Sequence, residues 1–432
     1  MRNNYIIIFI ILSIVPTQYV YGQKYNKEQC LKMAIDNNTK LINSHLSEKE
    51  ASLTKEEALT KYFPTVSASG LYFEASKPMV QMDMTLAAMG GISIPIEMLE
   101  KGKTASVTAI QPIFAGGRII NGNKLAKIGS DVSKLQTSLI QEEIIRNTES
   151  YFWQIVSLKE KLKTISTIKG QLENVHSTVD VSVKAGITTR NDLLRVELKQ
   201  QELESSEIKV KDGISILKMV LGQYIGIGTD TSGFDIVDTI FCVPASPNIF
   251  FIADEEAVLR RKELILMEKN IEANELQVKM EAGKYLPSIG AGASYIYHDF
   301  LGKDSDFGLA FASISIPISD CWGGSKAVRR LDLKRQRAVN EKENNTELLK
   351  VEINQSWNEL QQAYKQILIA EKSIASSQEN LRICNNSYNA GTISLTDLLD
   401  AQTLLQQSND LFCDACCDYQ IKLTKYLQIT GQ

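Results

Sequence analysis

The sequence has few of the features that mark an enzyme or a nucleic-acid-binding protein. Its formal net charge is −4 and 23% of its residues are charged, so no basic excess favours nucleic acid as a partner. The short Gly226-Ile-Gly228 stretch lacks the spacing of a phosphate-binding loop. The sequence shows no Ser/His/Asp constellation and no metal-ligand spacing. We therefore expect no catalytic site, cofactor or metal, and an enzyme is a distant alternative.

Long apolar runs are also scarce, and the only one lies at the start. Arg2 precedes the apolar residues 5–15, and Val20-Tyr21-Gly22 offers the small or branched residues that signal peptidase reads. We predict a signal peptide over residues 1–22. No lipobox surrounds this junction, so a lipid anchor is not expected. An exported chain without a further apolar stretch of roughly 20 residues is either soluble or crosses a membrane as strands.

The seven cysteines are an odd number for an oxidising compartment, so at least one thiol is unpaired or shared between chains. Helical spacing would put Cys413, Cys416 and Cys417 on neighbouring turns. A metal site there would lack histidine, because the three histidines are scattered and none is near in sequence. Ordinary packing as small apolar side chains is the favoured interpretation.

The sequence contains an internal repeat, in which the same proline and glycine positions recur in the same order. Residues 111–113 (Gln-Pro-Ile) return as 316–318 (Ile-Pro-Ile), and the Ala-Gly turn at Gly186 returns at Gly391, both 205 residues later. Each Pro-marked strand is followed by a Gly-Gly pair. The pattern predicts a tandem duplication, with a first repeat over residues 23–222, a linker over 223–250 and a second repeat over 251–432.

Each repeat contains two segments with strict alternation, which is typical of half-buried strands. In the second repeat Tyr295 and Tyr297 alternate with Ser294, and Phe307 alternates with Gly308. Residues 65–72 and 106–109 alternate in the same way in the first repeat. About ten such residues can span a bilayer when the strand is tilted. Taken alone, the pattern is equally compatible with a soluble hairpin.

Long helical segments follow the strands. Residues 123–184 contain no proline, and apolar residues recur every seven positions at Leu158, Ile165, Leu172 and Val179. The second repeat has the same spacing from Ile353 to Tyr388. This spacing indicates coiled-coil helices roughly 90–100 Å long. Medium helices are expected over residues 27–62, 191–221, 253–285 and 396–427, and they would pair with the long ones.

Four strands cannot close a barrel, because about eight are the practical minimum. Strands in lipid must close, so the chain is expected to oligomerise. Three copies would supply about 12 strands and about 12 helical pillars. The predicted fold class is mainly α with β: a tandem-duplicated trimer whose 12-stranded β-barrel continues as a 12-helix periplasmic α-barrel.

Residues 388–402 read Tyr-Asn-Ala-Gly-Thr-Ile-Ser-Leu-Thr-Asp-Leu-Leu-Asp-Ala-Gln. This stretch, with the repeated Pro-led strands and Gly-Gly junctions, resembles the TolC family of outer-membrane efflux proteins over essentially the whole mature chain. Its Gly-x-x-(Ser/Thr)-x-x-Asp-Leu-Leu-x-Ala-Gln pattern is the most specific part. The first-repeat counterpart, residues 186–197, is degenerate, with Arg195 where the second repeat has Asp400.

The resemblance implies a homotrimeric exit duct in the outer membrane, with its helical tunnel in the periplasm. A periplasmic adaptor and an inner-membrane transporter would supply substrate and energy for efflux or type I secretion, and lipid would surround the barrel. Gly186 and Gly391, with Asp192, would form the periplasmic tip turns. Asp397, Asp400 and Tyr388 match the channel entrance. The family's best-studied gate has an arginine where this chain has Ile393, so any lock here must use other contacts.

These site residues also have purely structural interpretations. Asp397 could simply cap the returning helix, and the glycines could serve left-handed turn geometry. Because Asp400 lies one turn after Asp397, the two carboxylates share a helix face, which favours a common role. The five methionines of residues 77–103 are interpreted as adaptable apolar surface rather than ligands for a soft metal. The main rival is a periplasmic coiled-coil structural or adaptor protein without a membrane barrel.

Overall fold

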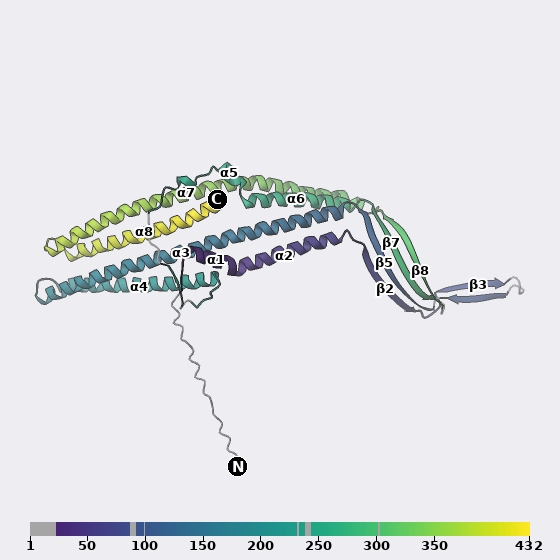
Figure 1. The fold of residues 1–432 in the computed structure, drawn as a ribbon, viewed down its shortest axis with the longest axis horizontal. Helices are drawn as coiled ribbons and strands as arrows, with labels where there is room; N and C mark the ends of the chain where they lie inside the picture. Colours follow the sequence, from purple (N-terminus) through teal and green to yellow (C-terminus); the bar gives the residue numbers. More distant parts are fainter. Residues whose placement is uncertain (1–22, 87–91, 99, 231–232, 238–242, 301–302) are drawn as a thin grey trace, which may run out of the picture. The chain divides into compact units, whose positions relative to one another are not determined.

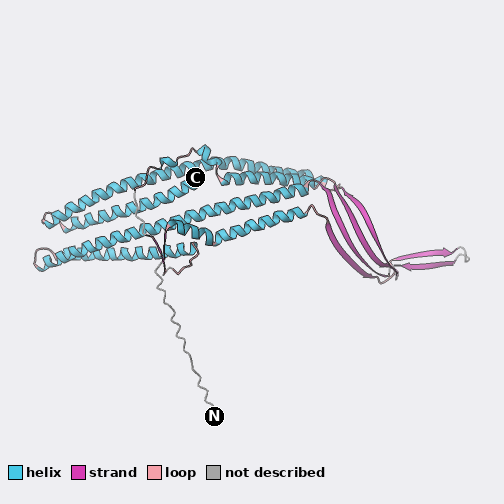
Figure 2. Ribbon diagram, viewed as in Figure 1, coloured by secondary structure: helices cyan, strands magenta, loops and turns pink. Residues whose placement is uncertain are grey.

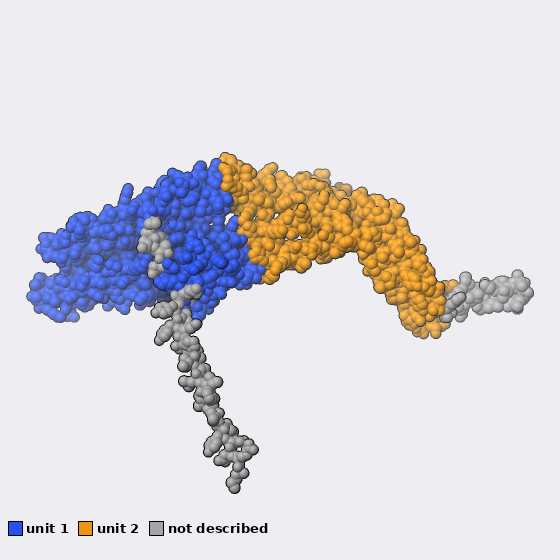
Figure 3. Space-filling view, in the orientation of Figure 1, with its two compact units in different colours: residues 1–42, 141–253, 353–432 blue, residues 43–140, 254–352 orange. Residues whose placement is uncertain are grey.

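The computed structural model describes residues 23–86, 92–98, 100–230, 233–237, 243–300 and 303–432. The predicted signal peptide lies outside these residues. The chain forms two compact units, each assembled from both sequence repeats (Figure 3). Unit 1 comprises residues 1–42, 141–253 and 353–432, and unit 2 comprises residues 43–140 and 254–352. The repeat boundaries inferred from the sequence therefore stay a prediction about the duplicated unit.

Unit 2 contains a four-stranded antiparallel sheet in which the strands of the two repeats meet (Figure 2). Its order is β2-β5-β7-β8. The strands are β2 (Thr65–Glu74), β5 (Lys101–Ala115), β7 (Ser288–Phe300) and β8 (Lys303–Ser315). All four predicted strands are present. The pairing of β5 with β7 joins the repeats, and β2 and β8 form the two edges of the sheet.

The register of the sheet separates two kinds of side chain. On one face Val107 lies opposite both Ala68 and Tyr295. On the other face hydroxyl pairs cross the strands, with Ser69 Oγ 2.9 Å from Ser106 Oγ and Thr108 Oγ1 2.8 Å from Ser294 Oγ. The β8 aromatic residues lie on the hydroxyl face, not on the face of the β7 tyrosines: Phe307 pairs with Ile296 and Phe311 with Gly292, on either side of the Ser294–Leu309 pair.

The loop between β2 and β5 contains a hairpin that the sequence pattern does not predict. Its strands are β3 (Val80–Leu86) and β4 (Ile92–Met98), paired antiparallel. Met79, just before β3, is exposed. The side chains of the other four methionines of this loop lie outside the residues whose side chains the structure describes, so the interpretation of the cluster stays a prediction.

The helices largely follow the prediction, with breaks that it missed. The long helices α3 (Arg118–Lys184) and α7 (Cys321–Asn389) have 67 and 69 residues, about 100 Å each. Each predicted medium helix before a sheet strand is broken once. The first is split into α1 (Lys27–Asn37) and α2 (Thr39–Thr60), and the second into α5 (Asp254–Leu259) and α6 (Lys262–Gly283) (Figure 1).

Polar side chains stabilise both helix breaks. Asn38 has an extended backbone, and its Nδ2 donates to the Tyr224 carbonyl at 3.0 Å while its Oδ1 accepts from the Lys40 N–H at 3.0 Å. Arg261 occupies the N-cap position of α6 with an extended backbone, and its guanidinium pairs with Glu352 at 2.9 Å. Propensity alone does not distinguish these positions from helix interior, because the contacts come from distant segments.

Unit 1 holds the returning helices α4 (Arg190–Tyr224) and α8 (Leu395–Thr430) with parts of α3 and α7. Its core contains residues of the predicted seven-residue spacing, including Ile165, Leu172 and Val179 from α3 and Leu360 and Ile367 from α7, all buried. Among the described residues, no helix is long and apolar enough to cross a bilayer.

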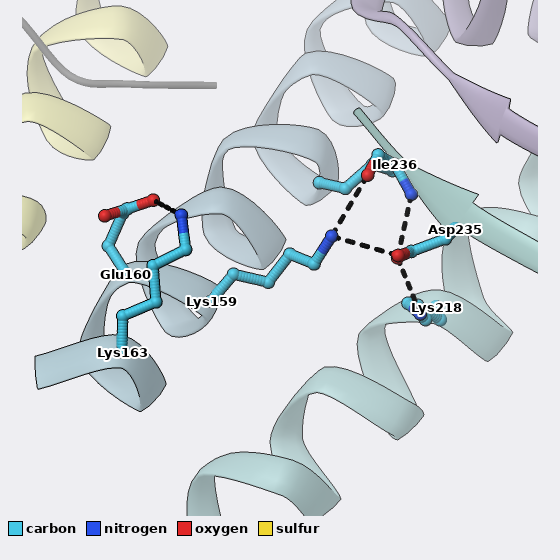
Figure 4. A network of polar contacts seen from close by, with 6 residues as sticks. All are labelled: Lys159, Glu160, Lys163, Lys218, Asp235 and Ile236. Carbon is cyan, nitrogen blue, oxygen red and sulfur yellow. Dashed lines mark hydrogen bonds and ion pairs between the residues drawn. The ribbon is translucent and has the colours of Figure 1, made fainter. Parts of the chain in front are cut away.

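The predicted linker lies within unit 1 and contributes a strand to it. Its strand β6 (Phe234–Ile236) pairs in parallel with β1 (Gln23–Tyr25). Asp235 of β6 bridges two lysines, at 3.1 Å from Lys159 Nζ and 2.7 Å from Lys218 Nζ (Figure 4). Lys159 also donates to the Ile236 carbonyl at 3.0 Å. Partial burial raises the pKa of Asp235. The hydrogen bonds from Lys218 and Lys159 outweigh this effect and lower the pKa overall.

The cysteines of α8 occupy packing positions. Cys413, Cys416 and Cys417 are buried free thiols. Burial raises the pKa of Cys413 and of Cys417 to about 12, which keeps both thiols protonated at neutral pH. Cys416 packs in an apolar cluster with Tyr419 and Tyr426. These surroundings support the packing interpretation.

Glu359 of α7 forms ion pairs with two lysines of α8, and these pairs make the stability of unit 1 depend on pH. Glu359 accepts from Lys422 at 3.0 Å and from Lys425 at 3.1 Å. The Lys422 hydrogen bond is the largest cause that lowers the Glu359 pKa from 4.5 to about 2. A lowered folded-state pKa stabilises the fold above about pH 4.5, and this stabilisation is lost as the pH falls toward 2.

We expect Glu359→Gln to lower the free energy of unfolding by about 1–2 kcal/mol at pH 7, because partial solvent exposure screens the ion pairs. The difference from wild type should shrink as the pH falls from 4.5 toward 2. Thermal unfolding of the two proteins across this range measures it. Glu379→Gln on the same helix is the control, because its pair with Arg382 is exposed and should matter little. A constant difference at all pH values would disprove the assignment.

Candidate functional site at the two helical turns

Both predicted tip turns have the same backbone geometry. After α3, Gly186 has a φ of +70°, its N–H donates to the Val183 carbonyl at 3.0 Å, and the Ile187 N–H donates to the Ser182 carbonyl at 2.9 Å. This pair of bonds is a Schellman motif, in which glycine takes the left-handed position. An added Cβ at Gly186 would meet nothing within 4 Å, so the backbone angle alone requires glycine there.

The second turn repeats this geometry. Gly391 has a φ of +70°, its N–H donates to the Tyr388 carbonyl at 2.9 Å, and the Thr392 N–H donates to the Ser387 carbonyl at 2.9 Å. Nothing lies within 4 Å of an added Cβ at Gly391. The sequence duplication therefore corresponds to a duplicated turn.

A capping box starts the returning helix after each turn. The Asp192 N–H donates to Thr189 Oγ1 at 3.3 Å, and the Asp192 carboxylate accepts from the Thr189 N–H at 3.2 Å. In the second repeat the Asp397 N–H donates to Ser394 Oγ at 3.3 Å, and the Asp397 carboxylate accepts from the Ser394 N–H at 3.0 Å. These reciprocal bonds satisfy donors that a helix start leaves free.

The two carboxylates of α8 differ in what they contact. Asp397 is exposed, but its Oδ2 is held by Ser394, whose hydroxyl donates at 2.7 Å and is the main cause of the lowered Asp397 pKa. Asp400 lies one turn later and is exposed. The contacts of Asp397 are those of the structural interpretation, in which it caps the helix. Its carboxylate is still charged and accessible to solvent, so capping and an entrance role are compatible.

Tyr388 links the two repeats beside the turns. It is half-buried and packs against an apolar cluster that includes Leu172, Val196 and Leu395, from three helices. Burial first, and then the negative charge of Asp192, raise the Tyr388 pKa. Tyr388 of the second repeat is therefore close enough to Asp192 of the first repeat to interact with its charge.

A polar contact that sequence reasoning missed also joins the turns. Arg195 Nη1 donates to Thr396 Oγ1 at 2.7 Å. Arg195 stands at the position in the first repeat that corresponds to Asp400 in the second. This departure from the motif was the only hint in the sequence that Arg195 makes a contact of its own. The positive charge of Arg195 also acts on Asp192. The pKa of Asp192 is lowered mainly by the Thr188 hydrogen bond and to a smaller extent by Arg195.

A cavity of about 450 Å³ lies beside Tyr388 and was not predicted. Amide side chains dominate its polar lining, including Gln171, Asn174, Asn385 and Gln402. Gln402 is only 4% exposed, and its Oε1 has no hydrogen-bond partner among the described residues. Such a polar wall, with no group of three or more acidic, histidine or cysteine ligands in the described part of the chain, offers hydrogen bonds rather than metal coordination.

This arrangement of long helix pairs and a four-stranded sheet is found in solved outer-membrane channels. CmeC of Campylobacter jejuni is similar with a TM-score of 0.79 and 14% identity, over 94% of this chain and 85% of that one. VceC of Vibrio cholerae is similar with a TM-score of 0.77 and 13% identity, over 94% and 96%. MtrE of Neisseria gonorrhoeae, described in its open state, gives 0.76 and 16%, over 94% and 88%. At these identities the likeness establishes the fold.

The chain thus has the same fold as these solved channels, and the predicted fold class, mainly α with strands, is confirmed. The sequence model of the outer membrane efflux protein family matches residues 255–432, which cover nearly all of the second repeat. The second repeat therefore matches this family in sequence, and the predicted resemblance is confirmed. A comparison of the sequence with curated proteins finds no match.

Proposed function

We propose that this protein is the exit duct of an efflux or type I secretion system, with three copies closing one pore through the outer membrane. The observation that carries the proposal is the open sheet of unit 2. Edge strands β2 and β8 have 10 and 13 residues, long enough to span a bilayer when tilted. Lipid cannot satisfy the backbone groups of two open edges, and four strands are too few to close. Three copies would pair β8 of one subunit with β2 of the next.

The purified mature protein is expected to require detergent and to run as a heat-sensitive trimer. We expect a trimer because the unpaired edge strands of a monomer would remain exposed, whereas copies of the same sheet can pair with them. Light scattering in detergent and gel migration before and after heating measure this state. A monodisperse monomer without detergent would overturn the proposal and favour the rival periplasmic coiled-coil protein.

The turns at Gly186 and Gly391 are proposed to face a periplasmic adaptor, which in turn contacts an inner-membrane transporter. The support is the duplicated Schellman geometry, which presents two similar exposed turns per chain. Three copies would present six such turns around one axis. In this arrangement Asp397, Asp400 and Tyr388 would lie at the entrance of the channel.

Cysteine crosslinking tests the adaptor contact. Thr392→Cys, beside Gly391, should crosslink to the adaptor in cells that express both proteins, because Thr392 is exposed. Ser67→Cys, an exposed residue of β2, is the control and should give no adaptor crosslink. Crosslinks from Ser67→Cys alone would show that the adaptor does not meet these turns.

A further inference from the structure

The first turns of α7 carry a one-sided basic face. Six exposed residues recur at spacings that place them on the same side of the helix. They are Trp322, Lys326, Arg329, Arg330, Leu333 and Arg337, and we call them the α7 basic face. Its two apolar members are unusually accessible, with Trp322 86% and Leu333 50% exposed.

Three acidic side chains lie near this face, and two of them have closer basic partners outside it. Asp332 pairs with Arg335 at 2.9 Å and also feels the charge of Arg329, which lies three residues before it. Glu281 of α6 pairs with Lys284 at 2.7 Å and also feels the charge of Arg330. Glu341 approaches Arg337 only to 3.9 Å, near the limit of an ion pair. These three acids offset part of the charge, but residues 322–337 of α7 contain six basic side chains and one acidic one, so the face keeps a net positive charge.

The start of α7 adds to this positive charge. The first turn of a helix carries a partial positive charge, which acidic residues commonly offset. The returning helices follow this rule, with Asp192 in α4 and Asp397 in α8. The two helices that leave the sheet, α3 and α7, have no acidic residue in their first turns. In α3 the exposed Lys124 and Lys127 follow instead.

The position of the face along the chain matches a membrane boundary. β8 ends at Ser315 and α7 begins at Cys321, with five residues between them. Lys326 to Arg337 occupy about 8–24 Å of helix rise from that start. Side chains on a helix lean toward its N-terminus, so these long cations extend toward the sheet. An exposed tryptophan at this boundary is typical of a membrane–water interface.

We propose that the α7 basic face binds the phosphate groups of anionic phospholipids in the leaflet next to the helices. The inference rests on the proposed insertion of the sheet into the outer membrane. Lysine and arginine beside an anionic bilayer surface gain favourable electrostatic energy, which salt weakens. Trp322, which lies nearer the sheet than these cations, supplies the apolar contact with the upper acyl chains.

Spin-labelled lipids test the proposal with the full-length mature protein. The trimer is reconstituted in phosphatidylcholine vesicles with a trace of either spin-labelled phosphatidylglycerol or spin-labelled phosphatidylcholine, and the motionally restricted fraction is measured. Wild type should favour phosphatidylglycerol about fivefold at low salt. Arg329→Gln/Arg330→Gln should remove most of this preference. Lys365→Gln/Lys372→Gln, which removes two exposed lysines further along α7, should retain it.

An equal lipid preference in wild type and Arg329→Gln/Arg330→Gln would overturn the proposal. A changed ion selectivity with unchanged lipid preference would also overturn it, because these arginines would then line the pore. Loss of the preference at about 1 M salt supports it, since the Debye length falls to about 3 Å. Conductance in pure phosphatidylcholine reads out the channel itself. Failure of the proposed function would appear there, separately from the lipid measurement.

Discussion

Gly283→Ala should lower the free energy of unfolding by about 3 kcal/mol or more and prevent a well-formed sheet–helix junction. Gly283 ends α6, and an alanine Cβ there would lie 2.2 Å from the Gly116 carbonyl oxygen. Gly116, just after β5, has a φ of +62°, and a Cβ on it would lie 2.0 Å from the Gly283 oxygen. Both obstacles are backbone atoms, so neither can swing aside as a flexible side chain would.

The matched control for this substitution is Gly129→Ala in α3. Gly129 is a helix-interior glycine of the same unit, and nothing lies within 4 Å of its added Cβ. Alanine there should stabilise the helix by about 0.5–1 kcal/mol through reduced backbone entropy. Thermal unfolding and the heat-sensitive trimer band compare the three proteins. Equal stability of Gly283→Ala and wild type would show that the two backbones can separate at little cost.

The elements that could be predicted are those whose signal is local. The seven-residue spacing through Leu172 and Val179 reports a buried helix face, and both residues are fully buried. Alternation around Tyr295 marked β7, and the Ala-Gly turns marked the ends of α3 and α7. Duplication strengthened each inference, because the same signal occurred twice.

The features that could not be predicted depend on contacts between distant segments. β5 pairs with β7 across nearly 200 residues of sequence, and nothing in either strand specifies its partner. β1 and β6 have three residues each, too short for a periodic signal. The break at Asn38 depends on the Tyr224 carbonyl, which only the fold brings near.

The candidate site was predicted in part for the same reason. Gly186 and Gly391 are needed for local backbone geometry, and such needs are readable from a motif. Capping by Asp397 was one of the two interpretations that the sequence offered, whereas the equivalent role of Asp192 emerged only from the structure. The Arg195–Thr396 bond and the amide-lined cavity join different repeats, so only the structure reveals them.

Asp397→Ala/Asp400→Ala is expected to weaken block of the channel by trivalent cations about tenfold or more and to reduce its cation selectivity. In the proposed trimer each carboxylate occurs three times around one axis. Six negative charges in a narrow entrance would repel one another and attract multivalent cations. Both side chains are exposed in the chain, so neutralising them removes charge without opening a packed core.

The two aspartates are distinguishable, because Asp397 also caps α8 while no capping bond is assigned to Asp400. Asp400→Ala alone should therefore reduce cation block with little effect on stability. Asp192→Ala removes the equivalent capping carboxylate of the first repeat, and it should cost about 1 kcal/mol of stability. Conductance of single channels in planar bilayers, with and without a trivalent cation, measures the block. If Asp397→Ala/Asp400→Ala conducts and is blocked as wild type is, these carboxylates do not line the constriction, and Asp397 serves the helix end alone.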